Sequence, residues 1–321
     1  MIIWLRFLLK RLTGNDMKKV IVTGANGFVG KNVCRFLSSA GVEVIAVIKD
    51  ENEYIDEIKD LDKLRIVYCD LEHIADLEKI ISDRDADVFY HFAWVGSAGP
   101  LRADCDVQIN NIRYTCEAVK LCSALNIKRF VFASSIMEYE IMKLMDSSSR
   151  PSGNTLYSSA KLSADFMART VASSFGVDYI RAVISNIYGP GETSPRLINS
   201  SIRKMLSGER CSFSPGEQMY DFIYVDDAAK TFVALGEKGI TDKTYYIGSK
   251  NPRPLKEFLI EMKDCVNPDL ELGLGDFTFN GISLSYEEFD INAVSEDTGF
   301  VPEVSFSEGI KNTMDWIREN S

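Results

Sequence analysis

The sequence predicts an α/β fold in which helices cover both faces of a parallel sheet. Short apolar runs rich in valine and isoleucine alternate with longer amphipathic stretches through roughly the first 180 residues. Glycine-rich or polar residues follow the end of each run, which is where sheets of this kind bind ligands. Residues 17–185 are therefore expected to form a doubly wound domain, and residues 186–321 mainly a smaller C-terminal lobe.

The composition is that of an ordinary globular protein with an excess of acidic residues. Of 321 residues, 45% are hydrophobic and 26% are charged, and the formal net charge of −11 argues against a nucleic-acid partner. The seven cysteines include no C-x-x-C pair, and His73 and His91 are far apart, so neither a metal site nor a disulfide framework is expected. Reduced thiols indicate a cytoplasmic protein.

Residues 1–16 are interpreted as an extension ahead of the folded domain, which would begin at Met17. The run MIIWLRFLLKRL is too short to span a bilayer, and it lacks the small-residue cleavage site of a signal peptide. Arg6 and Lys10 share a helical face, which leaves a membrane-surface helix open as an alternative. We expect no catalytic role for this extension and no stable membrane association.

A glycine-rich turn follows the first predicted strand. The segment GANGFVG occupies residues 24–30 and leads into an amphipathic helix. Gly24 permits the tight turn, Gly27 lets a pyrophosphate approach the backbone, and Gly30 lets helix and strand pack closely. The helix N-terminus would present free N–H groups to the phosphates. The pattern predicts a Rossmann domain that binds a dinucleotide through Gly24, Asn26, Gly27, Phe28, Val29 and Gly30.

The end of the second predicted strand, residues 42–48, bears on the choice of dinucleotide. An acidic side chain there would accept hydrogen bonds from the adenosine ribose of NAD, whereas a basic one would pair with the 2′-phosphate of NADP. Ile48 is followed by Lys49 and then by Asp50. Lys49 favours NADP(H) as the cofactor, and Asp50 leaves NAD(H) open.

Three further predicted strands should end at the same cleft, because the carboxyl ends of parallel strands meet at one edge of a sheet. They are residues 66–71, 88–93 and 129–135, with a helix over residues 108–125 between the last two. Asp70 would contact the adenine amino group or, alternatively, form a surface turn. The predicted cofactor contacts therefore extend to Asp70, Leu71, Phe92 and Ala93.

Tyr157 and Lys161 lie four residues apart in the segment NTLYSSAK. On a helix they would share one face, and although this spacing is common, Ser135 at a neighbouring strand end makes it chemically meaningful. A cation near a phenol stabilises the phenolate, so Tyr157 could exchange a proton with a carbonyl oxygen. Ser135 could hold the same oxygen. Ser135, Tyr157 and Lys161 are therefore the predicted catalytic residues.

Together these motifs resemble the extended short-chain dehydrogenase/reductase family of NAD(P)-dependent nucleotide-sugar epimerases and dehydratases. The resemblance runs from Lys18 to about Trp316 and covers GANGFVG (24–30), HFA (91–93), NNIRYT (110–115), FASSIMEY (132–139), YSSAK (157–161), SNIYGPG (185–191) and DFIYVDDAA (221–229). It implies that Asn111 joins the catalytic residues by positioning a water beside Lys161. It also implies that Tyr157 and Lys161 contact the cofactor, that the substrate is a nucleotide-diphosphate sugar, and that two chains form a homodimer through helices near 105–125 and 155–175.

The resemblance assigns the C-terminal lobe to the substrate, while residues from about 221 to 248 would return to the dinucleotide domain. Asn186 and Arg196 match positions where relatives touch the nucleotide sugar, although Arg196 could equally be a solvated loop residue. Relatives often carry an arginine before DFI, where this chain has Tyr220, and Arg253 is the candidate substitute. The predicted substrate contacts are Ser135, Glu138, Asn186, Arg196, Tyr220 and Arg253.

Departures from the family pattern narrow the reaction. Sugar 4,6-dehydratases place Asp-Glu directly after the catalytic hydroxyl, where this chain has Ile136 and Met137, so elimination of water is not expected. Glu138 is one place late, and a structural role is its alternative. Lys49 favours a 4-keto-sugar reductase that uses NADPH over a 4-epimerase that retains NAD. A catalytically silent nucleotide-binding regulator is a third interpretation, against which the intact serine, tyrosine and lysine argue.

Overall fold

The computed structural model describes residues 17–145 and 151–320, and the chain divides into two compact units. The first unit holds the chain up to Val183 together with Ala229–Tyr246 and Ala293–Val301. The second holds Ile184–Ala228, Ile247–Asn292 and the chain from Pro302 onward. The predicted extension, residues 1–16, lies outside the described residues. In the described part of the chain, no helix combines the length and apolar character needed to cross a membrane.

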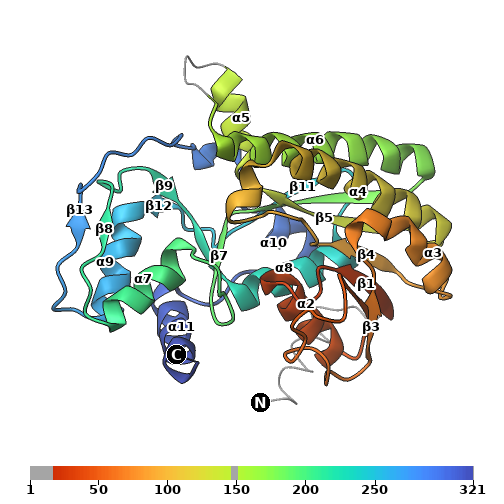
Figure 1. The fold of residues 1–321 in the computed structure, drawn as a ribbon, viewed down its shortest axis with the longest axis horizontal. Coiled ribbons are helices and arrows are strands. Elements are labelled where there is room, and N and C mark those ends of the chain that lie inside the picture. The colour runs from red at the N-terminus through yellow and green to blue at the C-terminus, as the bar shows by residue number, and fades with distance from the viewer. Residues whose placement is uncertain (1–16, 146–150, 321) are drawn as a thin grey trace. The chain divides into compact units, whose positions relative to one another are not determined.

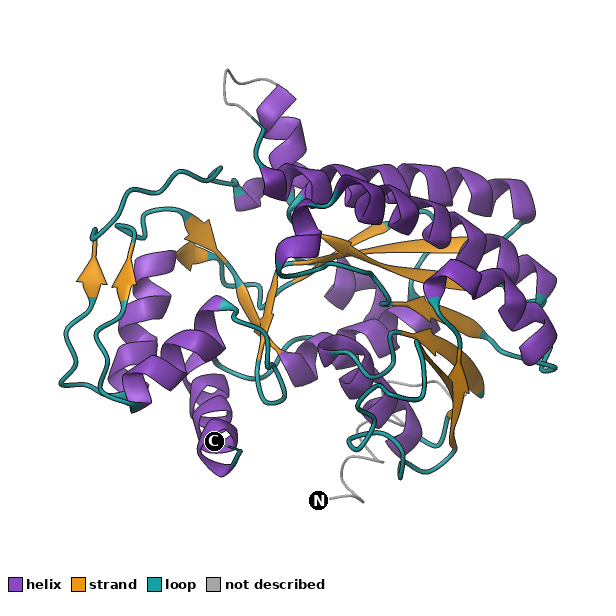
Figure 2. Ribbon diagram, viewed as in Figure 1, coloured by secondary structure: helices purple, strands orange, loops and turns teal. Residues whose placement is uncertain are grey.

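A seven-stranded sheet forms the centre of the first unit, with helices on both faces (Figures 1 and 2), which confirms the predicted fold class. Its order is β11-β6-β5-β4-β1-β2-β3, and the pairs β1–β2, β2–β3, β1–β4 and β4–β5 are parallel. The strand order reverses between β1 and β4, and ligands bind beyond the carboxyl ends at such a reversal. The strands are β1 (Lys19–Thr23), β2 (Glu43–Ile48), β3 (Leu64–Tyr68), β4 (Val88–His91), β5 (Arg129–Ser135), β6 (Asp178–Ile184) and β11 (Thr244–Ile247).

Two long helices, α4 (Cys105–Ala124) and α6 (Gly153–Phe175), pack together over one face of this sheet (Figure 1). Asp104 caps α4 by accepting a hydrogen bond from the Val107 N–H at 3.0 Å, and Gly176, in the left-handed conformation, ends α6. The opposite face carries α2 (Phe28–Ser39) and α8 (Val225–Lys238). The remaining elements of this unit are η1 (Leu71–Asp76), α3 (Leu77–Ile80), η2 (Pro100–Ala103), α5 (Glu138–Met145) and α10 (Ala293–Thr298).

Aromatic rings form the centre of the first unit's core. The rings of Phe89 and Phe130 stack with centroids 5.5 Å apart, and Phe130 in turn stacks on Tyr179 at 5.8 Å. These side chains come from β4, β5 and β6, and all three are at most 1% exposed. Strands buried on both faces need continuous apolar runs, which explains why these runs do not alternate with polar residues. The packed core holds the end of β5, and with it Ser135, in a defined place.

The second unit is built from three short strand pairs and three helices. Strands β7 (Asn186–Tyr188) and β10 (Phe222–Tyr224) pair in parallel, and β9 (Met219–Tyr220) pairs with β12 (Arg253–Pro254) in antiparallel register. Rings of Tyr188, Phe222, Phe258 and Phe306 lie in its core. The other elements are α7 (Leu197–Leu206), β8 (Ser212–Phe213), α9 (Leu255–Val266), β13 (Gly273–Leu274), η3 (Tyr286–Glu288) and α11 (Phe306–Glu319).

Candidate active site

The glycine-rich turn joins β1 to α2 so tightly that a side chain at Gly24 or Gly30 would clash with the backbone. Gly24 has a φ of +64°, and a Cβ there would lie 2.8 Å from the Ala93 backbone nitrogen. A Cβ on Gly30 would lie 2.1 Å from the Gly24 carbonyl oxygen. Gly27 precedes the first residue of α2, so the helix N-terminus opens directly on the turn. The turn thus brings a tightly packed backbone to the positive end of a helix, which fits a pyrophosphate.

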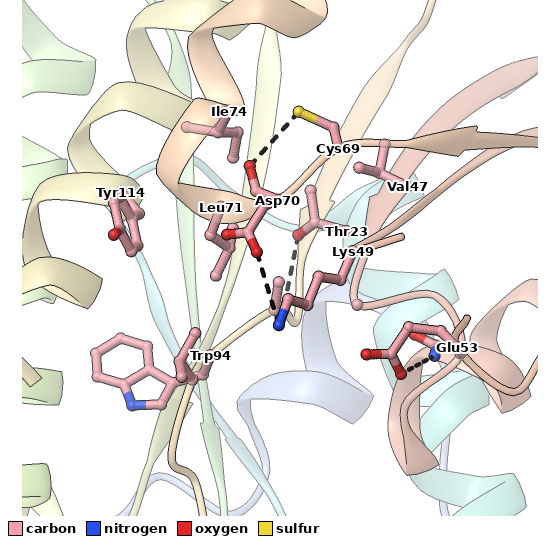
Figure 3. Close-up of a pocket in the computed structure, with 14 residues that line it drawn as sticks. Thr23, Val47, Lys49, Glu53, Cys69, Asp70, Leu71, Ile74, Trp94 and Tyr114 are labelled. Atoms are coloured by element: carbon pink, nitrogen blue, oxygen red, sulfur yellow. Dashed lines mark hydrogen bonds and ion pairs between the residues drawn. The ribbon is translucent and has the colours of Figure 1, made fainter. Parts of the chain in front are cut away.

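A pocket of about 450 Å³ opens beyond the carboxyl ends of β1 to β4 (Figure 3). The Lys49 ammonium lies 3.8 Å from the Asp70 carboxylate, and Glu53, which also lines the pocket, accepts a hydrogen bond from the Asn26 amide at 3.2 Å. A cavity of this size accommodates part of a dinucleotide. It is lined by Thr23, Gly24, Asn26, Val47, Lys49, Glu53, Cys69, Asp70, Leu71, Ile74, Ala93, Trp94, Val95 and Tyr114.

Six predicted cofactor residues line this pocket: Gly24, Asn26, Lys49, Asp70, Leu71 and Ala93. Phe92 does not line it, and its ring packs edge-on against Phe232 with centroids 4.8 Å apart, so its predicted cofactor contact stays a prediction. Sequence reasoning missed Thr23, Val47 and Cys69, which a strict application of the strand-end rule would have found. It also missed Glu53, Ile74, Trp94, Val95 and Tyr114, which reach the pocket from loops and helices whose positions depend on the fold.

The predicted catalytic residues come from β5 and α6 and are all buried. Tyr157 and Lys161 lie one turn apart on α6, and Ser135 ends β5, where its hydroxyl accepts a hydrogen bond from the Met137 N–H at 3.2 Å. The Lys161 ammonium donates to the Ala133 carbonyl at 2.8 Å, which ties α6 to the strand two residues before Ser135. Burial lowers the pKa of Lys161 to about 7. Lys161 therefore titrates close to neutrality.

Trp94 connects the cofactor pocket to these residues. Its indole lines the pocket, lies 3.8 Å from the Lys161 ammonium, and meets the Tyr157 ring in a T-shaped arrangement with centroids 6.0 Å apart. The indole N–H donates to the Gln108 side chain at 3.0 Å, which fixes the ring. A group bound in the pocket would consequently lie beside the tryptophan that touches both the phenol and the ammonium.

Asn111 is buried on α4, where its amide fastens the backbone that follows β4. Its Oδ1 accepts from the Val95 N–H at 3.0 Å and its Nδ2 donates to the Val95 carbonyl at 2.8 Å. The amide thus holds the loop that carries Trp94. Its predicted role in placing a water beside Lys161 stays a prediction.

Glu138 lies inside the protein, and its predicted substrate contact stays a prediction. Its side chain is fully buried, and it accepts hydrogen bonds from the Ser134 hydroxyl and from the Ser135 N–H. Its second oxygen forms an ion pair with Arg181, which also lies 3.3 Å from the Asp165 carboxylate. The carboxylate therefore has a structural role: it holds the strand end on which Ser135 sits.

His91 ends β4 between two hydroxyl groups. Its Nδ1 lies 2.9 Å from the Thr23 hydroxyl and its Nε2 lies 3.4 Å from the Thr115 hydroxyl. Burial, helped by the nearby Lys161 charge, lowers the pKa of His91 to about 3. The imidazole is therefore neutral at ordinary pH, and it links β1 to α4.

In the second unit, the predicted substrate residues have partners within that unit. Asn186 donates to the Asp221 carbonyl at 3.1 Å, and the half-exposed Arg196 lies 3.2 Å from Glu192. Arg253 and Tyr220 face each other across the β9–β12 pair, and the Arg253 guanidinium forms an ion pair with Glu261. The proposed substitute for the missing arginine thus stands directly opposite the position it would replace. Their contacts with substrate stay predictions.

Comparisons with known proteins agree with this geometry. A model of the NAD dependent epimerase/dehydratase family matches residues 20–248. The dTDP-glucose 4,6-dehydratase of Escherichia coli is 26% identical, with 94% of each chain covered. The structure of UDP-N-acetylglucosamine 4-epimerase from Methanobrevibacter ruminantium, in complex with UDP-N-acetylmuramic acid, is 25% identical with a TM-score of 0.80, covering 95% of this chain and 99% of that one. The Bordetella bronchiseptica enzyme WbmF in complex with NADH shares the fold at 21% identity, with a TM-score of 0.78 and 94% and 92% covered. The chain belongs to the NAD dependent epimerase/dehydratase family, as the motifs predicted.

Proposed function

We propose that this protein is a nucleotide-sugar 4-epimerase that uses NAD. The observation that carries the proposal is the position of Trp94, which lines the pocket beside the glycine turn and also touches Tyr157 and Lys161. Because Trp94 contacts both the pocket and Tyr157, a dinucleotide bound in the pocket would lie close to this acid–base residue. The glycine turn fits the cofactor, because Gly24 and Gly30 let strand, turn and helix pack without a backbone clash, and the N-terminus of α2 then opens on the turn where a pyrophosphate would bind.

The residues divide the work of hydride transfer at C4 between them. NAD bound at the glycine turn would supply the hydride acceptor and donor. Tyr157 takes the proton of the C4 hydroxyl as the alcohol is oxidised and gives it back when the ketone is reduced. Ser135 donates a hydrogen bond to the same oxygen while its charge develops. Lys161 favours the phenolate by its charge. Epimerisation follows when the keto-sugar rotates in the site between the two hydride transfers, so that the second hydride enters the opposite face of C4.

The lining of the pocket favours NAD over NADP. Lys49 lies between two acids, with Asp70 at 3.8 Å and Glu53 lining the same pocket. A 2′-phosphate placed here would approach both carboxylates, whereas a ribose hydroxyl would find acceptors. The solved structure of WbmF, in complex with NADH, gives a precedent for this cofactor in the fold. The sequence-based preference for NADP weighed Lys49 against Asp50 but did not place Asp70 and Glu53 in the same pocket.

Elimination of water is not proposed, although the relatives include dehydratases. Ile136 and Met137 occupy the positions where an acid and a base would be needed, and Ile136 is 5% exposed. The carboxylate that follows them, Glu138, is engaged by Arg181. The chain therefore offers hydride transfer at C4 without the groups for elimination.

A 4-keto-sugar reductase is the second candidate, because Lys49 does line the pocket and could bind a 2′-phosphate. Release and identification of the cofactor from purified protein separates the two. Tightly held NAD(H) that survives dialysis would support the epimerase. An empty site that takes up NADPH, with turnover of a nucleotide-linked 4-keto-sugar, would contradict the epimerase and establish the reductase.

Replacing Lys49 by alanine tests the cofactor assignment directly. If Lys49 contacts a 2′-phosphate, the Lys49→Ala change should weaken NADP binding by roughly 1–3 kcal/mol. The loss should fall toward the low end because the Lys49 side chain is 61% exposed. NAD binding should barely change. Titration calorimetry with both dinucleotides measures the effect, and Lys59→Ala, at another exposed lysine, is the matched control. Equal affinities in parent and variant would remove Lys49 from cofactor recognition.

We also propose that two chains associate through α4 and α6. Both helices carry exposed apolar side chains, among them Ile109 at 56%, Phe166 at 55% and Met167 at 53% exposure. Sedimentation of the purified protein should give twice the mass of one chain, and Phe166→Glu should shift it toward the monomer. A parent protein that sediments as a monomer at micromolar concentration would contradict this proposal.

A further inference from the structure

A second cation lies against the ring of the proposed proton carrier. Arg102, in η2, places its guanidinium carbon 4.0 Å from the centroid of the Tyr157 ring. Trp94 meets the same ring in a T-shaped arrangement and has the Lys161 ammonium 3.8 Å from its own ring. The Tyr157 ring thus contacts the Arg102 guanidinium directly. It also contacts Trp94, whose other neighbour is the Lys161 ammonium.

The loop after β4 sets the position of this arginine. The Arg102 guanidinium donates to the Ser97 carbonyl at 3.0 Å. Gln108, from α4, donates to the carbonyls of Gly96 and Leu101 at 3.2 and 3.0 Å. Gly96 has a φ of +71°, and a Cβ there would lie 2.7 Å from the Leu101 carbonyl oxygen. The loop therefore folds back on itself and holds Arg102 against α6.

Lys161 by itself supplies an incomplete charge at neutral pH. Its pKa of about 7 means that the ammonium has lost much of its charge near neutrality. An arginine keeps its charge throughout the accessible pH range. Arg102 can therefore still stabilise the phenolate at pH values where Lys161 has begun to lose its proton.

The titratable groups that interact with Arg102, Lys161 or the end of β5 do not supply a further cation. From α5, Glu138 is neutralised by its ion pair with Arg181. Glu140, on the same helix, has a pKa raised by burial, with the Arg102 charge acting in the opposite direction. His91, from β4, is neutral. Among these groups, the lysine and Arg102 are the cations that can favour a phenolate.

We propose that Arg102 is a positioning residue that favours the ionised form of Tyr157, so that the proton carrier works with two cations. The inference rests on the proposed role of Tyr157. A cation over an aromatic face is attracted to the ring electrons, and the attraction grows when the ring carries a negative charge. When the alcohol is oxidised, its O–H bond breaks and the phenol O–H forms, while bound NAD would take up the hydride that C4 loses. Reduction of the ketone reverses each of these changes.

The test is the pH profile of kcat/KM for Arg102→Met, which removes the charge and keeps much of the volume. Without the cation the phenol should ionise at a pH higher by roughly 1 unit. In the alcohol-oxidising direction the acidic limb of the profile should move up by the same amount, so that turnover below the limb falls about tenfold. Arg102→Lys keeps a positive charge, so its acidic limb should lie close to that of the parent protein. Arg35→Met removes an exposed arginine that lies over the Phe36 ring at 4.8 Å and should leave the profile unchanged.

A second measurement does not depend on turnover. The difference in tyrosinate absorbance between the parent and Tyr157→Phe isolates the ionisation of this one phenol, and the same difference in the Arg102→Met background should appear at higher pH. An unchanged titration and an unchanged limb would overturn the proposal, even with a raised KM, because Arg102 would then be a substrate contact. Should Arg102→Met fail to fold, an Arg102→Lys variant with the full shift would also overturn it. An active Tyr157→Phe would instead overturn the proposed function, while the titration would still report on Arg102.

Discussion

Turnover should fall by roughly 10²–10⁴ when Tyr157 is replaced by phenylalanine, the range that general acid–base catalysis contributes. Phenylalanine keeps the ring, and with it the contacts to Trp94 and Arg102, but it has no proton to transfer. Cofactor affinity and melting temperature should stay near the parent values, because the glycine turn and Lys161 are unchanged. The measurement is steady-state turnover of a panel of nucleotide sugars, followed by sugar analysis for epimerisation and by nicotinamide absorbance for net reduction.

Two comparisons sharpen this experiment. Tyr68→Phe, at a half-exposed tyrosine on β3, should leave turnover unchanged. Ser135→Ala should cost roughly 10²–10³, as expected for one donor lost from a developing oxyanion. The double variant should lose less than the product of the two factors, since both residues act on one oxygen. A Tyr157→Phe protein that works at the parent rate would exclude the phenol as the proton carrier.

Unfolding free energy should fall by about 3–5 kcal/mol in Glu138→Gln, the range for breaking a buried ion pair by removing one partner. The neutral amide cannot balance Arg181, which would keep only Asp165, 3.3 Å away, as a charged partner. It also offers only one oxygen, whereas the carboxylate serves Ser134, the Ser135 N–H and Arg181. Urea unfolding followed by circular dichroism measures the loss.

Glu43→Gln provides the matched control for that measurement. Glu43 pairs with Lys19 at 3.4 Å, but its side chain is 56% exposed, so the change should cost no more than about 1 kcal/mol. If Glu138 contacted substrate instead, its replacement would raise KM at unchanged stability. That outcome would contradict the structural role we assign to it.

The parts of the site that follow regular spacing could be predicted from the chain order. Tyr157 and Lys161 share a helical face because residues four apart always do, and the glycine turn lies at a strand end because parallel strands need a crossover helix. Element boundaries shifted by only a few residues: the helix predicted over 108–125 is α4, Cys105–Ala124. Chains fray at helix ends, so differences of this size carry no structural meaning.

The partners of individual side chains could not be predicted in this way. The sequence does not show that the Asn111 amide hydrogen-bonds to the Val95 backbone, or that Asp70 and Glu53 line the same pocket as Lys49. Glu138 was assigned to the substrate on its place after the catalytic serine. Each sequence-based role was judged from the residues next to it in the chain. The partner seen in the structure lies far away in sequence.

Spacing along this chain was enough for the fold class, the glycine turn and the shared helical face of Tyr157 and Lys161, because each follows from short-range periodicity or from a rule common to all parallel sheets. Long-range packing was needed for the rest. Arg181 reaches Glu138 across 43 positions, and Trp94 and Arg102 reach Tyr157 from the loop after β4. Whether such side chains meet depends on how the helices lie on the sheet, and whether a buried charge is tolerated depends on the partner it then finds. Residue spacing predicts neither the contact nor the partner. The charged groups near the phenol could therefore be identified only from the folded structure.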